Sequence, residues 1–193
     1  NVLPLTDIFL PSIAELTYLL QPRRYQTLNT SSLGSFVNAV PESLIRELGE
    51  VVLEHGPKAV MIKCGPRGIY LRTNQAQAWE KGGRGLLGLS TAWHAQELWA
   101  PAFKVQVQGT TGAGDAAVAG FLASMLQAAD PETALSMAAA AGACAVESPD
   151  RARGLPAWDA LLARIKNGWD VHPLELEEHN WQKDTTHALW YRK

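Results

Sequence analysis

The distribution of apolar residues along the chain predicts strands that alternate with helices. Continuous apolar runs in residues 6–11 and 59–64 have the length of short strands that are buried on both faces. The turn at 65–68, Gly-Pro-Arg-Gly, leads into 69–73, which we expect to return as a hairpin partner of 59–64. A further strand is predicted at 103–108, where the sequence reads FKVQVQ.

Helical signals fill much of the remaining chain. Ser12 followed by Glu15 three residues later is typical of a capping box, and predicts a short helix that continues to Leu20. Apolar residues at helical spacing between Pro41 and Gly56 predict a longer helix. Three more helices are predicted in the second half, at residues 115–129, 130–146 and 154–165.

Two segments lack such signals. Residues 22–40 are polar and irregular, and residues 80–98 contain four glycines, so we expect both to be loops. The alternation of apolar strands with helices predicts an α/β sandwich with a mainly parallel central sheet.

Composition excludes several classes of function. The chain has 193 residues, of which 47% are hydrophobic and 19% charged, as in an ordinary globular protein. A formal net charge of −2 gives no support for a nucleic-acid or membrane partner, and no apolar run has the roughly 20 residues of a membrane span. No signal peptide is recognisable, so we expect a cytoplasmic protein. The two cysteines and five histidines show no metal-ligand spacing.

The segment GTTGAGDAAVAGF, residues 109–121, carries the candidate chemistry. Gly112, Ala113 and Gly114 join a predicted strand to a predicted helix and leave backbone N–H groups with almost no side-chain cover. Unsatisfied N–H groups and a partial positive charge make a helix N-terminus suitable for phosphate. Asp115 then either accepts a proton during phosphoryl transfer or caps the helix, and spacing alone leaves both roles open.

Two common nucleotide motifs fit this segment poorly. A P-loop requires a lysine after its second glycine, and none follows here. Gly112, Gly114 and Ala117 satisfy the dinucleotide fingerprint, but the predicted helix is followed by another helix instead of a strand. A dinucleotide-dependent oxidoreductase is therefore the weakest of the functions considered.

The segment TTGAGDAAVAGFLASML resembles the C-terminal signature of the PfkB (ribokinase-like) sugar kinase family. Other segments resemble the family in the same order over about residues 3–166, namely FLPSIAEL, VMIKCGPRGIYL, ELWAPAFKVQVQGTTGAGD and GLPAWDALL. The resemblance implies a ribokinase-like three-layer sandwich, with residues 1–166 as the C-terminal nucleotide-binding and catalytic portion and 167–193 as an extension. The chain begins with Asn1, so we expect the lid and the sugar-binding motif of such a kinase to lie upstream.

The resemblance also implies ATP- and Mg²⁺-dependent phosphorylation of a hydroxyl group on a sugar or similar alcohol. A homodimer is one possible oligomeric state. Asp115 would be the catalytic base, and Gly112, Ala113 and Gly114 would form the anion hole. Glu15 would help to hold Mg²⁺. The implied nucleotide-binding residues are Lys63, Gly65, Gly68, Thr111 and Ala139.

Two departures from the family pattern change these implications. Ser12 stands where the family has asparagine near the metal, and Gly109 stands where it has an aspartate beside a monovalent cation. The sequence therefore gives no support for a monovalent-cation site. Both departures keep a second hypothesis open, namely a non-catalytic nucleotide-binding or regulatory module of the same fold.

The aromatic residues give one further expectation. Trp169, Trp181 and Trp190 lie in the C-terminal extension, so we expect it to pack on the domain or on a partner. Trp79, Trp93 and Trp99 are expected to be packing residues.

Overall fold

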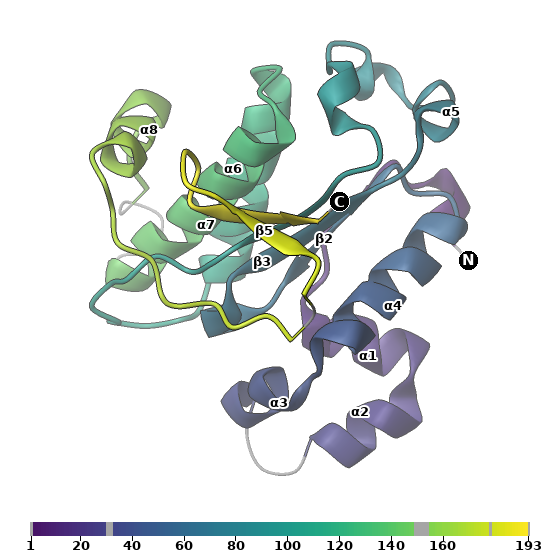
Figure 1. Cartoon of the computed structure of the whole chain (residues 1–193), viewed down its shortest axis with the longest axis horizontal. Coiled ribbons are helices and arrows are strands. Elements are labelled where there is room, and N and C mark those ends of the chain that lie inside the picture. Colours follow the sequence, from purple (N-terminus) through teal and green to yellow (C-terminus); the bar gives the residue numbers. More distant parts are fainter. Residues whose placement is uncertain (1, 30–32, 149–154, 178, 193) are drawn as a thin grey trace.

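The computed structural model describes residues 2–29, 33–148, 155–177 and 179–192. Its centre is a six-stranded sheet with the strand order β1-β2-β3-β4-β6-β5. Helices pack on both faces of the sheet, which gives three layers (Figure 1). The strands are β1 Ile8–Phe9, β2 Ala59–Lys63, β3 Ile69–Thr73, β4 Glu97–Ala100, β5 Trp181–Asp184 and β6 Leu189–Arg192.

The strand directions correct one expectation. Only β1 and β2 pair in parallel, whereas the other four pairs of neighbouring strands are antiparallel. The sheet described here is therefore mixed, and the predicted parallel majority is not confirmed. Helices cover both faces of this sheet, so its strands are continuously apolar whatever their direction, and an apolar run alone does not report whether its neighbour is parallel.

Two helical layers enclose separate cores. Met61 of β2 and Leu71 of β3 pack against one layer, while Val60 and Ile62 of β2 pack against the other, because successive side chains of a strand point to opposite faces. The first layer contains α6 Ala113–Leu126, α7 Pro131–Glu147 and α8 Trp158–Lys166, and the second contains α1 Ile13–Leu20, α2 Pro22–Leu28, α3 Leu33–Ala39 and α4 Glu42–Glu54. A short helix, α5 Ala76–Trp79, lies between β3 and β4.

The helices predicted from caps and periodicity are present. Ser12 and Glu15 form the expected capping box at α1, and Asp130 caps α7 through a hydrogen bond from the Thr133 N–H. The loop predicted at 22–40 is wrong, because α2 and α3 form there. Pro22 occupies the first turn of α2, where its missing N–H has no cost, and the buried side chain of Phe36 holds α3 in the core.

The strand predicted at 103–108 is also wrong. The strand of this region is β4, which lies partly within the expected loop at 80–98 and ends before Pro101. Phe103 makes only an isolated antiparallel bridge, to Val171. Val105 and Val107 alternate with polar residues, as in a strand, but both valines line a pocket and do not pair with a neighbouring strand.

The C-terminal extension packs on the domain, as its tryptophans predicted. Strand β6 pairs with β4, and β5 follows it at the edge of the sheet. The carboxylate of Glu42, which is fully buried, accepts hydrogen bonds from the Trp181 indole N–H and from the Glu177 backbone N–H. Trp93 and Trp99 are likewise fully buried packing residues.

No helix in the described part of the chain is long and apolar enough to span a membrane.

Candidate active site

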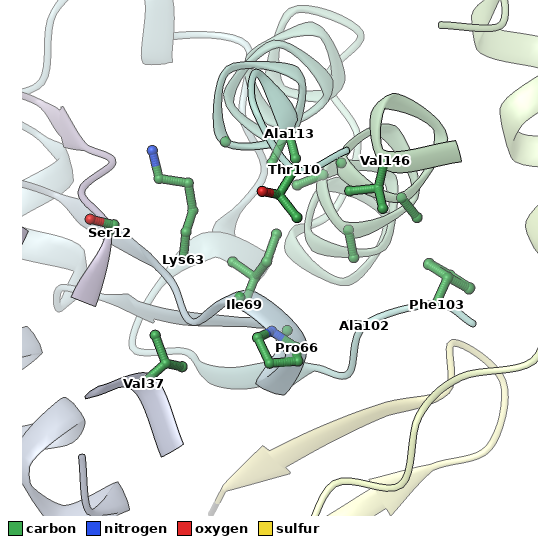
Figure 2. Close-up of a pocket in the computed structure, with 18 of the residues that line it drawn as sticks. Ser12, Val37, Lys63, Pro66, Ile69, Ala102, Phe103, Thr110, Ala113 and Val146 are labelled. Atoms are coloured by element: carbon green, nitrogen blue, oxygen red, sulfur yellow. The ribbon is translucent and has the colours of Figure 1, made fainter. Parts of the chain in front are cut away.

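A pocket of about 540 Å³ lies where the C-terminal end of β2 faces the N-terminus of α6 (Figure 2). Its walls come from α1, α3, the β2–β3 turn, residues 102–110, α6, α7 and His172 of the C-terminal extension. All but one of the site residues expected from the sequence line it, namely Glu15, Lys63, Gly65, Gly68, Gly112, Ala113, Gly114, Asp115 and Ala139. Thr111 is exposed and does not line the pocket, whereas its neighbour Thr110 does.

The N-terminus of α6 forms one side of the pocket. Gly112 is its N-cap residue and has a left-handed backbone (φ 85°), which glycine adopts without steric cost. Ala113 is the first helical residue, and its N–H donates to the Thr110 carbonyl at 3.3 Å, whereas the N–H groups of Gly114 and Asp115 belong to the turn that has no intrahelical acceptors. Gly112 is the N-cap and no described side chain caps the helix, whereas Asp115 is its third residue, so the capping role left open by the sequence is wrong.

Lys63 brings a full positive charge to the same place. Its backbone N–H donates to the Pro11 carbonyl, 2.9 Å away, which fixes the end of β2 beside α1. A Cβ atom built on Gly114 would lie 3.6 Å from the Lys63 ammonium nitrogen, so the ammonium group packs directly against the glycine backbone. The lysine charge and the helix N-terminus therefore act together on any anion bound here.

Glu15 adds a carboxylate to the pocket wall. Its Oε2 atom accepts a 2.7 Å hydrogen bond from the Ser12 N–H, and the Ser12 hydroxyl accepts one from the Glu15 N–H at 3.2 Å. The bond from the Ser12 backbone, followed by that from its side chain and by the charge of Lys63, lowers the pKa of Glu15. Ser12 thus has a structural role as the N-cap, and it keeps Glu15 ionised beside the anion end of the pocket.

The two glycines of the β2–β3 turn are required by the backbone. Gly65 and Gly68 have φ angles of 52° and 85°, in the left-handed region. A Cβ on Gly68 would lie 1.9 Å from the Ala100 carbonyl oxygen, so no side chain fits between this turn and the end of β4. Both residues line the pocket, but their conformations already explain why glycine is needed there.

The other end of the pocket is apolar and was largely missed by sequence reasoning. Small residues of α7 form one wall, and Phe103, Val105, Val107 and Val146 form much of the remainder. Figure 2 shows Phe103 and Val146 across the pocket from Lys63 and Ser12. The alanine-rich sequence of α7 predicts close packing, and Gly120 indeed approaches Met137 so closely that a Cβ would meet its carbonyl oxygen at 2.8 Å. The small residues of α7 also line the pocket, but nothing in the sequence distinguishes this role from packing against α6.

Two observations limit the chemistry. Burial raises the pKa of the Cys64 thiol to about 12, so this residue beside Lys63 is a neutral packing group and not a nucleophile. Among the residues that the structure describes, no group of three or more acidic, histidine or cysteine side chains could hold a metal ion by itself.

A three-layer α/β fold with a lysine and a glycine-lined helix N-terminus in one pocket is typical of proteins that bind phosphorylated ligands. Residues 1–158 match the model of the pfkB family carbohydrate kinases, and the chain belongs to this family. Comparison with curated proteins finds no match.

Solved structures confirm the ribokinase-like fold. A putative ribokinase II from E. coli, in complex with ATP and Mg²⁺, is 24% identical with a TM-score of 0.59, over 86% of this chain and 41% of that one. Aminoimidazole riboside kinase from Salmonella enterica, complexed with aminoimidazole riboside and an ATP analogue, is 25% identical with a TM-score of 0.54, over 83% and 42% of the two chains. Ribokinase from Arabidopsis thaliana, complexed with ribose and ATP, is 21% identical with a TM-score of 0.58, over 84% and 41%. The chain thus spans less than half the length of these proteins.

Proposed function

We propose that residues 1–166 form the ATP-binding and catalytic portion of a carbohydrate kinase, which phosphorylates a hydroxyl group on a sugar or sugar-like molecule. The observation that carries this proposal is the convergence of Lys63, the N-terminus of α6 and Asp115 on one pocket. Membership of the pfkB family supports it.

Each group has a separate task in the proposed reaction. Asp115 accepts the proton of the substrate hydroxyl. The hydroxyl oxygen then forms a bond to the γ-phosphorus of ATP while the bond between that phosphorus and the β–γ bridging oxygen breaks, which releases ADP. Gly112, Ala113 and Gly114 form the anion hole, where backbone N–H groups would stabilise the charge on the oxygens of the transferring group. Lys63 holds the phosphates in line with the hydroxyl.

The residues present also fit ATP and Mg²⁺. The pocket combines an anion end with an apolar end, as a nucleotide requires, and two carboxylates, Glu15 and Asp115, line it. Mg²⁺ commonly uses one or two carboxylates together with substrate phosphates and water, and when bound it neutralises phosphate charge. Glu15 remains ionised for this role because its pKa is lowered.

Lys63→Met tests the anion end of the pocket in the full-length protein. We expect the dissociation constant for Mg²⁺–ATP, measured by calorimetry, to rise about 10- to 100-fold, because a hydrogen bond to a charged group contributes about 1.5–3 kcal/mol. Lys183→Met is the matched control, since Lys183 is an exposed residue of β5 that does not line the pocket. Equal affinities for wild type and Lys63→Met would remove Lys63 from the site.

Transfer of γ-phosphate from labelled ATP to a panel of sugars and nucleosides tests the reaction itself. Phosphorylation of at least one acceptor supports a kinase. ATP binding without transfer to any acceptor would favour the non-catalytic nucleotide-binding module, and binding of NAD in preference to ATP would contradict both.

Turnover is expected to be nearly independent of K⁺. Gly109 offers no carboxylate, and the space where its side chain would extend is open. One lost carboxylate weakens an oxygen-ligand cation site substantially. The measurement is the rate during a KCl titration at constant ionic strength, and a several-fold saturable activation would show that other oxygens build the site.

A further inference from the structure

The C-terminal extension returns to the candidate active site after α8. The Lys104 N–H donates to the Asp170 carbonyl and the His172 N–H donates to the Ala102 carbonyl, both at 2.8 Å. Phe103 and Val171 form an antiparallel bridge between these two bonds. Residues 170–172 therefore run alongside 102–104, the segment that forms one wall of the pocket, although they lie beyond the residues that match the family model.

Side chains hold this segment in place from both sides. The Trp169 ring stacks on Phe103 with 4.5 Å between centroids, and its indole N–H donates to the Lys104 carbonyl at 3.0 Å. The Arg164 guanidinium lies 3.4 Å from the centroid of the same indole ring and forms an ion pair with Glu147 of α7 at 2.6 Å. The position of residues 169–172 is thus fixed by α7, α8 and the pocket wall together.

The chain after this segment is anchored as well. Leu174 and Leu176 pack against the core beneath α4, and the buried Glu42 accepts hydrogen bonds from Glu177 and Trp181. With both flanks attached, residue 172 is held at the pocket and does not belong to a free end.

His172 itself lines the pocket, beside Ala102 and Phe103. Figure 2 shows Ala102 and Phe103 on the side of the pocket away from Lys63. The other lining residues near this end are Val105, Val107, Ala138, Ala139, Gly142, Ala143 and Val146. His172 is exposed at the rim of the pocket and, with Thr110, adds a polar side chain to a wall that is otherwise made of apolar and small residues.

This arrangement suits the heteroaromatic base of a nucleotide. If the phosphates lie at Lys63, the base of the same molecule reaches the apolar end. The walls there offer a face for a planar ring, and an imidazole can stack on that ring or exchange a hydrogen bond with its polar edge. A binding site of this kind orients its ligand through a few polar groups on a mainly apolar surface.

We propose that residues 169–172 are a built part of the nucleotide site and that His172 recognises the heteroaromatic base of the bound nucleotide. This inference rests on the proposed function, because it assigns the phosphate groups to the Lys63 end. It assigns to the C-terminal extension a role in binding in addition to its role at the sheet edge.

The experiment compares two ligands that share a phosphate chain, ATP and inorganic triphosphate, each with Mg²⁺, by calorimetry on the full-length protein. For His172→Ala we expect the dissociation constant of ATP to rise about five- to tenfold, as for loss of one hydrogen bond or ring contact, and that of triphosphate to stay unchanged. His179→Ala, an exposed histidine in the same extension that does not line the pocket, should change neither.

The outcomes separate this inference from the proposed function. Unchanged ATP affinity in His172→Ala, or equal losses for ATP and triphosphate, would overturn base recognition while leaving the kinase proposal intact. Binding of neither ligand by the wild type would overturn both. His172→Gln gives a second test, since an amide keeps hydrogen-bonding ability, and it should restore part of the discrimination between ATP and triphosphate if a hydrogen bond to the base is responsible.

Discussion

Asp115→Asn is expected to lower the rate of phosphoryl transfer by about 10²-fold or more in the full-length protein, while ATP affinity stays the same or rises slightly. Asparagine keeps the shape of the side chain but cannot accept the hydroxyl proton, and general-base catalysis contributes about 10²- to 10⁴-fold. Loss of the negative charge near the phosphates removes a repulsion. Single-turnover rates and calorimetric ATP titrations measure the two effects separately.

A matched control comes from another helix. Asp159 is also an acidic residue in the first turn of a helix, α8, and is exposed, but it does not line the pocket. Asp159→Asn should therefore reproduce the small loss of helix-dipole stabilisation, about 0.3–1 kcal/mol, without any change in rate. Equal rates for wild type and Asp115→Asn would exclude Asp115 as the base and would favour the non-catalytic module.

The anion end of the pocket could be predicted because its signals are local. The capping box of Ser12 and Glu15, the turn at 65–68 and the segment Gly112–Asp115 each depend on a few adjacent residues, and the structure brings all three to one pocket. Lys63 joins them because it ends a strand that the apolar run at 59–64 had already located. Such features follow from backbone conformation and hydrogen-bonding needs that neighbouring residues determine.

The remaining parts depend on contacts between distant residues. Val105 and Val107 have the alternation of a strand, yet the strand is formed by Glu97–Ala100, because those residues pair with β3 on one side and β6 on the other. His172 carries no motif, and it reaches the pocket through contacts with distant residues, namely its hydrogen bond to Ala102 and the stacking of Trp169 on Phe103, 66 positions earlier in the chain. The turn at 65–68 correctly predicted the antiparallel pairing of β2 with β3, but nothing in the composition of the other strands reported their direction. In these cases, pairing between distant segments determines which residues form strands and which line the pocket, and the local sequence pattern does not.

Gly68→Ala is expected to destabilise the fold strongly, by about 3 kcal/mol. Two effects combine at this residue. Its backbone, with φ 85° and ψ −139°, lies in a region that is sparsely populated by residues other than glycine and costs an alanine about 1–3 kcal/mol, and the added Cβ would lie 1.9 Å from the Ala100 carbonyl oxygen. That oxygen belongs to backbone that β3 and the buried Trp99 hold in place, since the Trp99 indole donates to the Arg67 carbonyl at 2.8 Å. Relief therefore requires a shift of the turn, at the usual cost of overpacking, about 1–3 kcal/mol.

Gly168→Ala is the control for a positive φ without a close contact, because Gly168 has a φ of 86° but open space where the Cβ would lie. Urea unfolding should show a loss of only about 1–2 kcal/mol for this control, which is the conformational cost alone. The additional loss in Gly68→Ala then measures the close approach of the turn to β4. Because this turn follows Lys63 closely, Gly68→Ala should also weaken ATP binding in the protein that remains folded. Equal losses of stability in the two variants would show that the turn moves away from Ala100 freely, and that Gly68 is needed only for its backbone conformation.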